Sequence, residues 1–330
     1  MQSRNHSQVA ARDTLPRRIL GRTGLEVSVL GMGGVGAMGK YGPVTRESFA
    51  LTMTRAAELG MNFLDTSPDY GDSEAVFGYY LQDHRDDWIV CTKVGGCLGR
   101  ENLTRQQVLE QLPQSLERLR VDYADVVLIH SIHQYGKGAA AIERLLAPGG
   151  AVEGLKELQE EGKVRFIGVS GHVPELLPAL ATDLFDVALT YNSFNLLMQY
   201  AHKELFPLAQ KHNVGIVVAG AFYQGLLTPD RESVLQRKDQ WFERDDPGYY
   251  RTQELLDRLE RLRDLVEGDD QALRSLALRF AFSHPAISLV ISGMTCCEEV
   301  EENVAATLLG PLSTDELQQV ADVLGTTLSW

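Results

Sequence analysis

The chain is poor in cysteine, in long apolar runs and in clustered basic residues. It has only 4 cysteines among 330 residues; Cys296 and Cys297 are adjacent, and no pair has the tandem C-x-x-C spacing of a metal site. This usage is typical of reduced thiols and excludes a small disulfide-stabilised scaffold. We therefore expect a cytoplasmic protein without a resident metal.

No run of about 18 apolar residues is present, so the sequence predicts no membrane-spanning helix. Lys and Arg number 31 against 45 Asp and Glu, which gives a net charge of −14, and basic residues form only short pairs such as Arg17-Arg18. A chain this acidic is poorly suited to binding phosphate backbones. We expect neither a nucleic acid nor a membrane among its partners.

What the chain does have is the composition of a globular protein, with 44% hydrophobic and 23% charged residues. Its first segment is polar and lacks the apolar core of a secretory signal, so we predict a flexible tail over residues 1–14. The remaining residues, 15–330, suffice for two domains or for a single α/β barrel. Length alone leaves that choice open.

Short apolar runs alternate with longer amphipathic segments along the chain. The apolar runs predict eight strands, and the spacing of apolar residues between them predicts helices. The predicted strands are Ser28–Gly33, Met61–Asp65, Trp88–Lys93, Ala124–His130, Val164–Ser170, Asp186–Tyr191, Val214–Ala219 and Ile287–Ser292. The predicted helices are Arg46–Leu59, Arg105–Arg120, Val152–Glu161, Ala201–His212 and Ser313–Leu324.

The intervals between strand ends favour one domain. The first six run from 21 to 40 residues, enough for one strand and one helix each, while the last is 73 residues long. Eight strands, each followed by a helix, predict a single (β/α)8 TIM barrel of the α/β class. We expect loop inserts after the fourth and seventh strands, the latter with an extra helix over about residues 229–263, and a hairpin around Gly21–Gly24 that closes the bottom of the barrel.

The glycine-rich segment Gly31–Gly36 matches the G-x-G-x-x-G pattern of dinucleotide-binding folds and follows a predicted strand. In those folds the pattern opens a helix, whereas here more glycines and Pro43 follow, and the next helix is predicted from about Thr45. We interpret the segment as a barrel loop. Its glycines, Gly33 and Gly34 among them, let a flat ligand approach the backbone.

Titratable side chains gather where barrels carry their chemistry, at the C-terminal ends of strands and in the loops that follow. Three consecutive predicted strands end in Asp65, Lys93 and His130, and Tyr70 lies in the loop after the first. Each residue alone has an ordinary structural explanation, as a turn former, a solvated strand end, a core histidine or a packed ring. Together they predict a connected site on one face of the barrel.

The chemistry of this site follows from its residue types. Asp65 and Lys93 are expected to form an ion pair, because a buried charge needs a partner. The ammonium group of Lys93 near the Tyr70 hydroxyl favours the phenolate form, which makes Tyr70 a general acid or base. His130 is expected to hydrogen-bond the substrate oxygen and orient it.

These residues lie in segments that resemble the aldo-keto reductase superfamily: Asn62–Gly71 (NFLDTSPDYG), Thr92-Lys93 and Leu128–His130 (LIH). The likeness extends over about residues 17–324 and includes the segment 157–170. It implies a barrel that binds a nicotinamide cofactor without a doubly wound domain. It also implies a catalytic tetrad in which Tyr70 donates or accepts the proton, formed by Asp65, Tyr70, Lys93 and His130.

The resemblance implies cofactor contacts as well. The family's asparagine after Ser170 is replaced by Gly171, for which His172 is a candidate substitute or an ordinary loop residue, and the aromatic residue expected near Ala219 is missing. Phe222 or Tyr223 is a candidate replacement for that ring. The full set of implied cofactor-binding residues is Gly33, Gly34, Ser170, Asn192, Gly220, Phe222, Gly225, Leu227, Ser292, Gly293, Met294, Thr295, Glu299, Glu302 and Asn303.

The choice between NAD and NADP rests on the segment after the last strand. Family members that prefer the phosphorylated cofactor often have Arg four residues before the asparagine that corresponds to Asn303; here the residue is Glu299. A carboxylate repels a 2′-phosphate but accepts a hydrogen bond from a 2′-hydroxyl. Because no Lys or Arg follows Arg279, we predict NAD, with NADP as the alternative. A second explanation is that Glu299 stabilises a helix N-terminus.

Four short segments carry a closer resemblance: Asp65–Gly71 (DTSPDYG), Ser170-Gly171, Gly293–Thr295 (GMT) and Val300–Ala306 (VEENVAA). They are most similar to the sugar 1-dehydrogenase branch, which contains the L-galactose and D-threo-aldose 1-dehydrogenases. That resemblance implies oxidation of a small-molecule sugar at C1 to a lactone, although aromatic residues of the long insert, Trp241, Phe242, Tyr249 and Tyr250, match no single substrate. Alternatives are a broad aldehyde or ketone reductase and a non-catalytic cofactor-binding subunit. A metal-dependent hydrolase using His130, His133 and His172 is disfavoured, because the first strand carries no pair of histidines and residues three apart on a strand face opposite sides.

Overall fold

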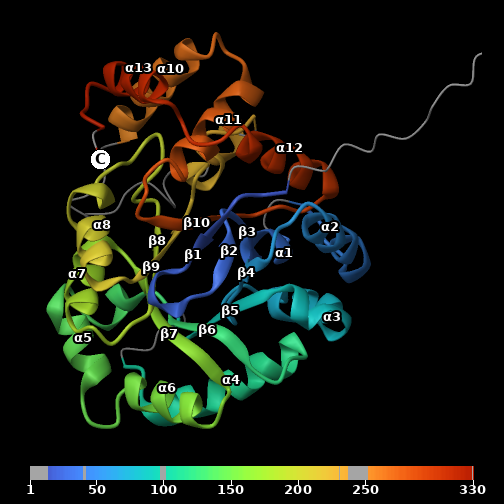
Figure 1. The fold of residues 1–330 in the computed structure, drawn as a ribbon, viewed down its shortest axis with the longest axis vertical. Helices are drawn as coiled ribbons and strands as arrows, with labels where there is room; N and C mark the ends of the chain where they lie inside the picture. Colours follow the sequence, from blue (N-terminus) through green and yellow to red (C-terminus); the bar gives the residue numbers. More distant parts are fainter. Residues whose placement is uncertain (1–13, 40–41, 97–101, 230, 237–251, 329) are drawn as a thin grey trace, which may run out of the picture.

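The computed structural model describes residues 14–39, 42–96, 102–229, 231–236, 252–328 and 330. Eight parallel strands form a closed barrel in the order β10-β3-β4-β5-β6-β7-β8-β9, which confirms the predicted architecture (Figure 1). These strands are β3 (Leu30–Gly33), β4 (Phe63–Asp65), β5 (Ile89–Val94), β6 (Ala124–Ile129), β7 (Val164–Gly171), β8 (Val187–Tyr191), β9 (Gly215–Ala219) and β10 (Ile287–Ser292).

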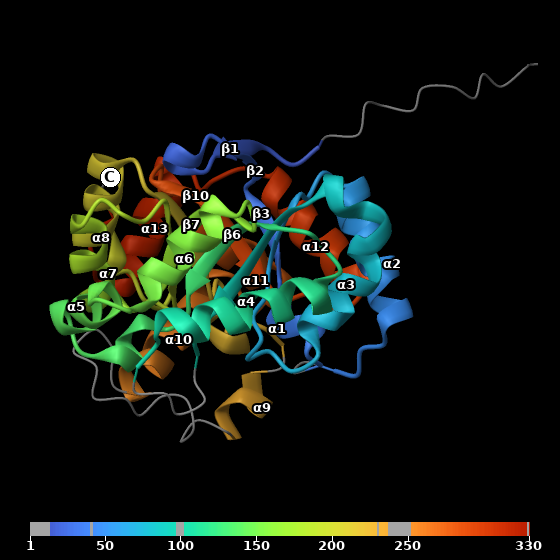
Figure 2. The same cartoon turned by 90° about the horizontal axis from the view of Figure 1, so that it is seen from below.

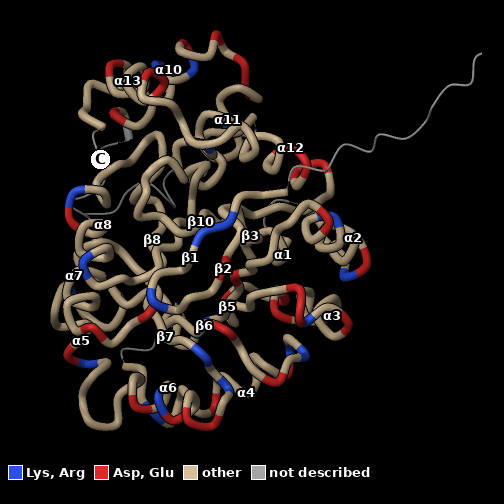
Figure 3. The backbone as a smooth tube through the Cα atoms, viewed as in Figure 1, with Lys and Arg blue, Asp and Glu red and all other residues tan. Residues whose placement is uncertain are grey.

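Helices surround the barrel and carry most of its charged residues (Figures 1 and 3). The longer helices after the first strands are α2 (Arg46–Glu58), α3 (Ser73–His84), α4 (Arg105–Leu119), α6 (Ala151–Glu160), α7 (Val173–Ala181) and α8 (Ala201–His212). Those nearer the C-terminus are α10 (Thr252–Leu265), α11 (Asp270–Ala281), α12 (Cys297–Leu308) and α13 (Thr314–Leu324). Their buried apolar side chains join those on the outer face of the strands in one continuous outer core.

Both predicted inserts contain additional helices. After β6 the chain forms the 3-10 helix η3 (Ile132–Tyr135) and the short helix α5 (Ala139–Leu146) before α6. After β9 it forms the 3-10 helix η4 (Tyr223–Gly225), α9 (Arg231–Gln236) and α10, so the predicted region 229–263 holds two described helices rather than one. The aromatic residues expected there, 241–250, and the predicted tail up to residue 13 lie outside the described residues.

Two differences from the predicted elements occur near the N-terminus. The run predicted as the single strand Ser28–Gly33 is divided at Val29, whose N–H donates to Pro16 O, so Ser28 ends the hairpin and Leu30 begins the barrel. The glycine-rich segment is not wholly a loop, because it contains the one-turn helix α1 (Gly34–Ala37). It is nevertheless part of a closed barrel rather than an open doubly wound sheet.

The predicted hairpin is confirmed and covers the N-terminal end of the barrel. Strands β1 (Arg17–Ile19) and β2 (Glu26–Ser28) pair antiparallel around the 3-10 helix η1 (Gly21–Thr23). Leu20 and Val27 are fully buried and join the apolar side chains that fill the barrel interior. Figure 2 places this hairpin at the opposite end of the barrel from α9.

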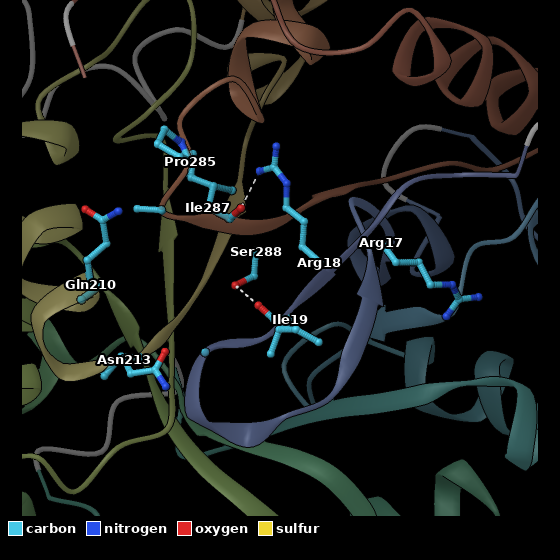
Figure 4. Close-up of a pocket in the computed structure, with 12 residues that line it drawn as sticks. Arg17, Arg18, Ile19, Gln210, Asn213, Pro285, Ile287 and Ser288 are labelled. Atoms are coloured by element: carbon cyan, nitrogen blue, oxygen red, sulfur yellow. Dashed lines mark hydrogen bonds between the residues drawn. The ribbon is translucent and has the colours of Figure 1, made fainter.

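A cavity of about 550 Å³ lies beside the hairpin, between β1, the end of α8 and the start of β10. In Figure 4 Arg18 points toward β10, where its guanidinium donates to Ile287 O at 2.6 Å, while Ser288 Oγ donates to Ile19 O at 3.1 Å. These bonds tie the hairpin to the barrel wall. The cavity is at the end of the barrel opposite the predicted site.

Candidate active site

Alternation of side chains along the strands decides which residues enter the barrel. Phe63, Cys91 and Leu128 belong to the cluster of apolar side chains inside the barrel. Because side chains two positions apart lie on the same face of a strand, the next inward positions toward the C-terminal end are those of Asp65, Lys93 and His130. Strands β4, β5 and β6 are neighbours, so these three groups lie side by side.

The predicted ion pair between Asp65 and Lys93 is confirmed. Lys93 Nζ donates to both carboxylate oxygens of Asp65 at 2.7 Å and to Thr66 O at 2.8 Å. Both side chains are almost completely buried. Burial by itself lowers the pKa of Lys93, but the neighbouring acidic groups, Asp65 first and then Tyr70 and Cys91, together outweigh this effect and the pKa is raised. Lys93 therefore remains a fixed positive charge at neutral pH.

Tyr70 completes the group from the loop between β4 and α3. Lys93 Nζ lies 4.8 Å from the centroid of the Tyr70 ring, within the range of a cation–π contact. The Tyr70 and His130 rings meet edge to face with their centroids 5.6 Å apart. The backbone N–H of Tyr70 donates to Ser67 O at 3.0 Å, which fixes the turn. The structure thus brings all four predicted residues, Asp65 included, to one place.

His130 is held by neighbours that the sequence did not single out. Its Nδ1 lies 3.1 Å from Ser67 Oγ and 3.1 Å from Asp69 Oδ2. Burial lowers the pKa of His130, and the contact with Asp69 opposes this without reversing it. The imidazole is therefore neutral at pH 7. Asp69 lies in the segment Asn62–Gly71 that carries the resemblance, but the resemblance implies no role for it.

A second buried carboxylate supports β5 from outside the barrel. Glu74 on α3 accepts a hydrogen bond from Thr92 Oγ1 at 2.6 Å and one from Arg118 Nε at 2.8 Å. Thr92 is next to Lys93 and faces the opposite side of the strand. Glu74 therefore anchors the strand that carries the lysine without entering the site.

The predicted nicotinamide contacts lie on the strands across the barrel. Ser170 lies one residue before the end of β7, and its Oγ accepts a hydrogen bond from the Ser131 N–H at 3.0 Å. Asn192 follows β8 with a φ of 52°, and Gly220 follows β9 with a φ of 81°. A Cβ at Gly220 would collide with Asn192 Oδ1, so the glycine makes room for the amide. These side chains border the barrel mouth that Lys93 faces.

Ser292 offers the clearest test of whether a polar ligand fits here. It ends β10, is 5% exposed, and its Oγ has no hydrogen-bond partner among the described residues. A buried hydroxyl without a partner is costly unless a ligand or water satisfies it. Because Leu289 and Ile291 face the barrel interior, alternation places Ser292 on the other face of β10, with Val290, and a contact between its hydroxyl and a cofactor stays a prediction.

The glycines of the first loop pack against protein. A Cβ at Gly33 would lie 3.2 Å from Ser292 O, one at Gly34 would lie 2.7 Å from Ser73 Oγ, and one at Gly36 would lie 2.8 Å from Met294 O. The absence of side chains therefore has a structural cause, the close approach of neighbouring segments. Contact between their backbone and a cofactor stays a prediction.

The predicted adenosine segment has partners that bear on cofactor choice. Glu299 Oε2 accepts hydrogen bonds from Thr295 N at 2.6 Å and from Thr295 Oγ1 at 3.1 Å. Glu299 therefore satisfies the backbone N–H and the hydroxyl group of Thr295, just before α12 begins. Glu302 forms a 2.8 Å ion pair with Arg274 of α11. The prediction from sequence considered only the residues after Arg279. Arg274 lies before them, on a helix that packs beside α12.

The remaining predicted positions are distributed around this segment. Gly293 and Asn303 are partly exposed and Met294 is fully buried. In η4 and its flanks, Tyr223 and Leu227 are buried and Phe222 packs on the outer core rather than inside the barrel. Gly225 takes a φ of 99° within that turn. The rings of Phe222 and Tyr223 therefore do not lie with the apolar side chains inside the barrel.

Three other side chains form a cluster at the mouth. Tyr191 Oη lies 3.3 Å from His172 Nε2 and 3.5 Å from His133 Nδ1. His133 lies in η3, not on a strand, so the argument from strand alternation does not apply to it. Even so, no group of three metal-ligating side chains was found within the described ranges. Tyr191 packs against the side chains inside the barrel, beside Ala219.

Comparisons with known proteins agree with this geometry. Residues 29–324 match the model of the "Aldo/keto reductase family". The chain is 31% identical to L-galactose dehydrogenase of Arabidopsis thaliana over 326 residues, with 93% of each chain covered. It is 25% identical to D-threo-aldose 1-dehydrogenase of a Pseudomonas species, with 85% of this chain and 89% of that one covered. An aldo-keto reductase structure from Bacillus halodurans in its holo form superposes with a TM-score of 0.73 at 27% identity, covering 94% and 96%.

Proposed function

Because the chain belongs to the aldo/keto reductase family, we propose that it is an NAD-dependent sugar dehydrogenase that oxidises the C1 hydroxyl of an aldose to a lactone. The observation that carries the proposal is the gathering of Asp65, Tyr70, Lys93 and His130 at the C-terminal end of the barrel. Relatives named for sugar dehydrogenation support an aldose as the substrate.

Each residue of the group has a distinct role in this proposal. Tyr70 accepts the proton of the C1 hydroxyl, since the fixed positive charge of Lys93 favours its phenolate. Asp65 balances the charge of Lys93 and holds its ammonium group in place. His130 orients the substrate oxygen. When bound, the nicotinamide cofactor supplies the hydride acceptor.

For the cofactor, we assign Ser170 and Asn192 to the nicotinamide amide, and Ser292 to the polar part of the cofactor nearest β10. The segment from Gly293 to Asn303 holds the adenosine half. We favour NAD because the carboxylate of Glu299 is fixed at the start of α12 by Thr295, where it repels a 2′-phosphate.

A reducing compartment fits the thiols of the chain. Cys91, Cys296 and Cys297 are all free, which supports the cytoplasm as the place of action. None of the helices in the described ranges is long and apolar enough to cross a bilayer.

The proposal is tested with the purified chain, NAD⁺ or NADP⁺, and a panel of aldoses, by following absorbance at the nicotinamide band. We expect reduced cofactor to form with at least one aldose, with a higher kcat/KM for NAD⁺. Turnover confined to the reduction of simple aldehydes and ketones would instead identify a broad reductase. Cofactor binding without any turnover would identify a non-catalytic subunit.

One substitution tests the choice between NAD and NADP. Glu299→Arg is expected to raise kcat/KM with NADP⁺ relative to NAD⁺, because attraction replaces repulsion. The matched control is Glu298→Arg, which adds the same charge at the exposed neighbouring position. If both variants change the preference equally, Glu299 has no specific role.

A further inference from the structure

A buried arginine of the long insert after β9 has no part in the mechanism proposed above. Arg258 on α10 is only 6% exposed, and its guanidinium group donates to Gln199 Oε1 at 2.6 Å. Gln199 is 4% exposed and belongs to the loop between β8 and α8. Arginine is seldom buried to this extent unless polar groups meet its guanidinium. The contact therefore links the insert firmly to the loop after β8.

Gln199 in turn binds Asn195 in the same loop. Gln199 Nε2 donates to Asn195 O at 2.8 Å and to the carbonyl oxygen of the next residue at 2.6 Å. The side chain of Asn195 is fully buried, and its Oδ1 accepts the N–H groups of Leu197 and Met198 at 2.9 Å and 3.0 Å, which closes a tight turn. Asn195 Nδ2 donates to Gly220 O at 3.1 Å. Arg258, Gln199 and Asn195 thus form a buried network between α10 and the end of β9.

The network ends beside a residue that we assign to the cofactor. A Cβ at Gly220 would collide with Asn192 Oδ1, so the backbone of Gly220 limits where the Asn192 amide can lie. Asn192 N also donates to Ala219 O at 3.2 Å. Because Asn192 is only three residues before Asn195, the turn that Asn195 closes holds the loop from its other side. Asn192 is therefore fixed by two segments, and Asn195 binds both of them.

We propose that the residues of the buried network are positioning residues that hold Asn192 in place for the cofactor, so that helix α10 contributes to cofactor affinity through the loop after β8. The inference rests on the proposed function, which assigns Asn192 to the nicotinamide amide. A binding group that is already ordered loses less conformational freedom when the ligand binds. Releasing the loop should therefore weaken cofactor binding. The groups assigned to catalysis should be unaffected, because they come from β4 to β6 and the loop after β4.

Asn195→Asp tests a single hydrogen bond of the network. Aspartate is closely similar in shape and keeps the acceptor for the turn, but an ionised carboxylate cannot donate to Gly220 O. We expect the Kd for NADH to rise by about three- to tenfold, the range for one lost hydrogen bond. It is measured from the change in NADH fluorescence on binding to the purified chain, at mildly alkaline pH. A Kd equal to that of the wild type would overturn the proposal.

Arg258→Met tests the other end of the network. Methionine keeps much of the side-chain volume and removes the donor to Gln199. The Kd for NADH should again rise by about three- to tenfold, and Arg258→Lys, which keeps a donor, should lie closer to the wild type. The matched control is Arg261→Met, at an exposed arginine of the same helix, which should leave the Kd unchanged. Wild-type affinity in Arg258→Met would show that α10 has no role in cofactor binding.

Two further measurements separate positioning from a merely structural effect. Partial unfolding lowers the number of NADH sites per chain, whereas a displaced loop keeps that number and raises the Kd. Hydrogen exchange on the chain without cofactor should be faster over residues 192–200 and 219–226 in Arg258→Met, but not in Arg261→Met. Unchanged exchange in these segments would contradict the proposal. If the wild type binds NADH but oxidises no aldose, the proposed function fails while the Kd values still decide the role of the network.

Discussion

The two ends of the barrel use the same eight strands for opposite purposes. At the C-terminal end, Lys93, Asp65 and His130 are buried ionisable groups whose charges and hydrogen bonds must be matched. At the N-terminal end, the hairpin residues Leu20 and Val27 fill the barrel with apolar side chains. One end gathers the groups to which we assign catalysis, and the other supplies hydrophobic contacts that keep the barrel closed.

At the closed end the chain packs closely around Leu20. A Cβ at Gly215 would lie 2.6 Å from Leu20 Cδ1, so β9 begins with a glycine to admit that side chain. Arg22 donates to Phe185 O at 2.8 Å and pairs with Asp183 at 2.7 Å. Arginines at this end therefore satisfy backbone carbonyls, whereas the lysine at the other end is positioned for chemistry. We therefore expect substitutions at the C-terminal end of the strands to change activity, and substitutions at the N-terminal end to change stability.

The largest expected effect is on activity at the open end. Tyr70→Phe removes the proposed proton acceptor and should lower kcat by about 10²- to 10⁴-fold with an unchanged melting temperature. Tyr79→Phe on α3 is the matched control and should retain full activity. A Tyr70→Phe enzyme with wild-type turnover would show that the open end does not depend on this hydroxyl.

Substitutions in the Asp65–Lys93 ion pair should affect both activity and stability. Asp65→Ala leaves the ammonium group of Lys93 buried with only a backbone oxygen, and should cost about 3–5 kcal/mol of unfolding free energy in urea denaturation. The double variant Asp65→Leu/Lys93→Met should recover much of that loss while remaining inactive. If the double variant is as unstable as the single one, the cost comes from packing rather than from the unpaired charge.

Substitutions at the closed end should lower stability and leave activity unchanged. Leu20→Ala opens a cavity at the base of the barrel and should lower the unfolding free energy by about 2–5 kcal/mol, with kcat unchanged at a temperature where the variant is folded. Ile19→Ala, at a side chain that is 55% exposed, should change stability by less than about 0.5 kcal/mol. A loss of kcat in Leu20→Ala would contradict the expectation that the closed end affects stability alone.

The last effect is confined to acidic pH. His284, between α11 and β10 at the closed end, has its pKa lowered to about 4 by burial. The unfolded chain binds this proton near pH 6.5, so the folded state loses stability as pH falls from about 6.5 to about 4, and loses no more below that. His284→Asn keeps an acceptor for the Ala286 N–H, which donates to His284 Nδ1 at 3.1 Å. This variant should lose stability less steeply in that pH range and match wild type at pH 7 in thermal unfolding.

Local patterns carried the prediction far in some regions. The strand Ile287–Ser292 and the helix Ala201–His212 were predicted with their observed bounds, and the capping box of Thr104 and Gln107 is present. Each depends on apolar periodicity or on a side chain within a few residues of the helix start. Where glycines made the pattern ambiguous, as at α1, the prediction of a loop was wrong. The glycines there admit close neighbours, since a Cβ at Gly36 would lie 2.8 Å from Met294 O, so they indicate tight packing rather than the absence of a helical turn.

The sequence by itself determined the number of strands, the closed barrel and the strand ends that carry Asp65, Lys93 and His130, because alternation and strand spacing are properties of neighbouring residues. The tertiary structure alone decided which distant groups became partners: Asp69 beside His130, and Arg274 beside Glu302. Such contacts depend on how loops and helices pack in three dimensions. No periodicity along the chain encodes that packing.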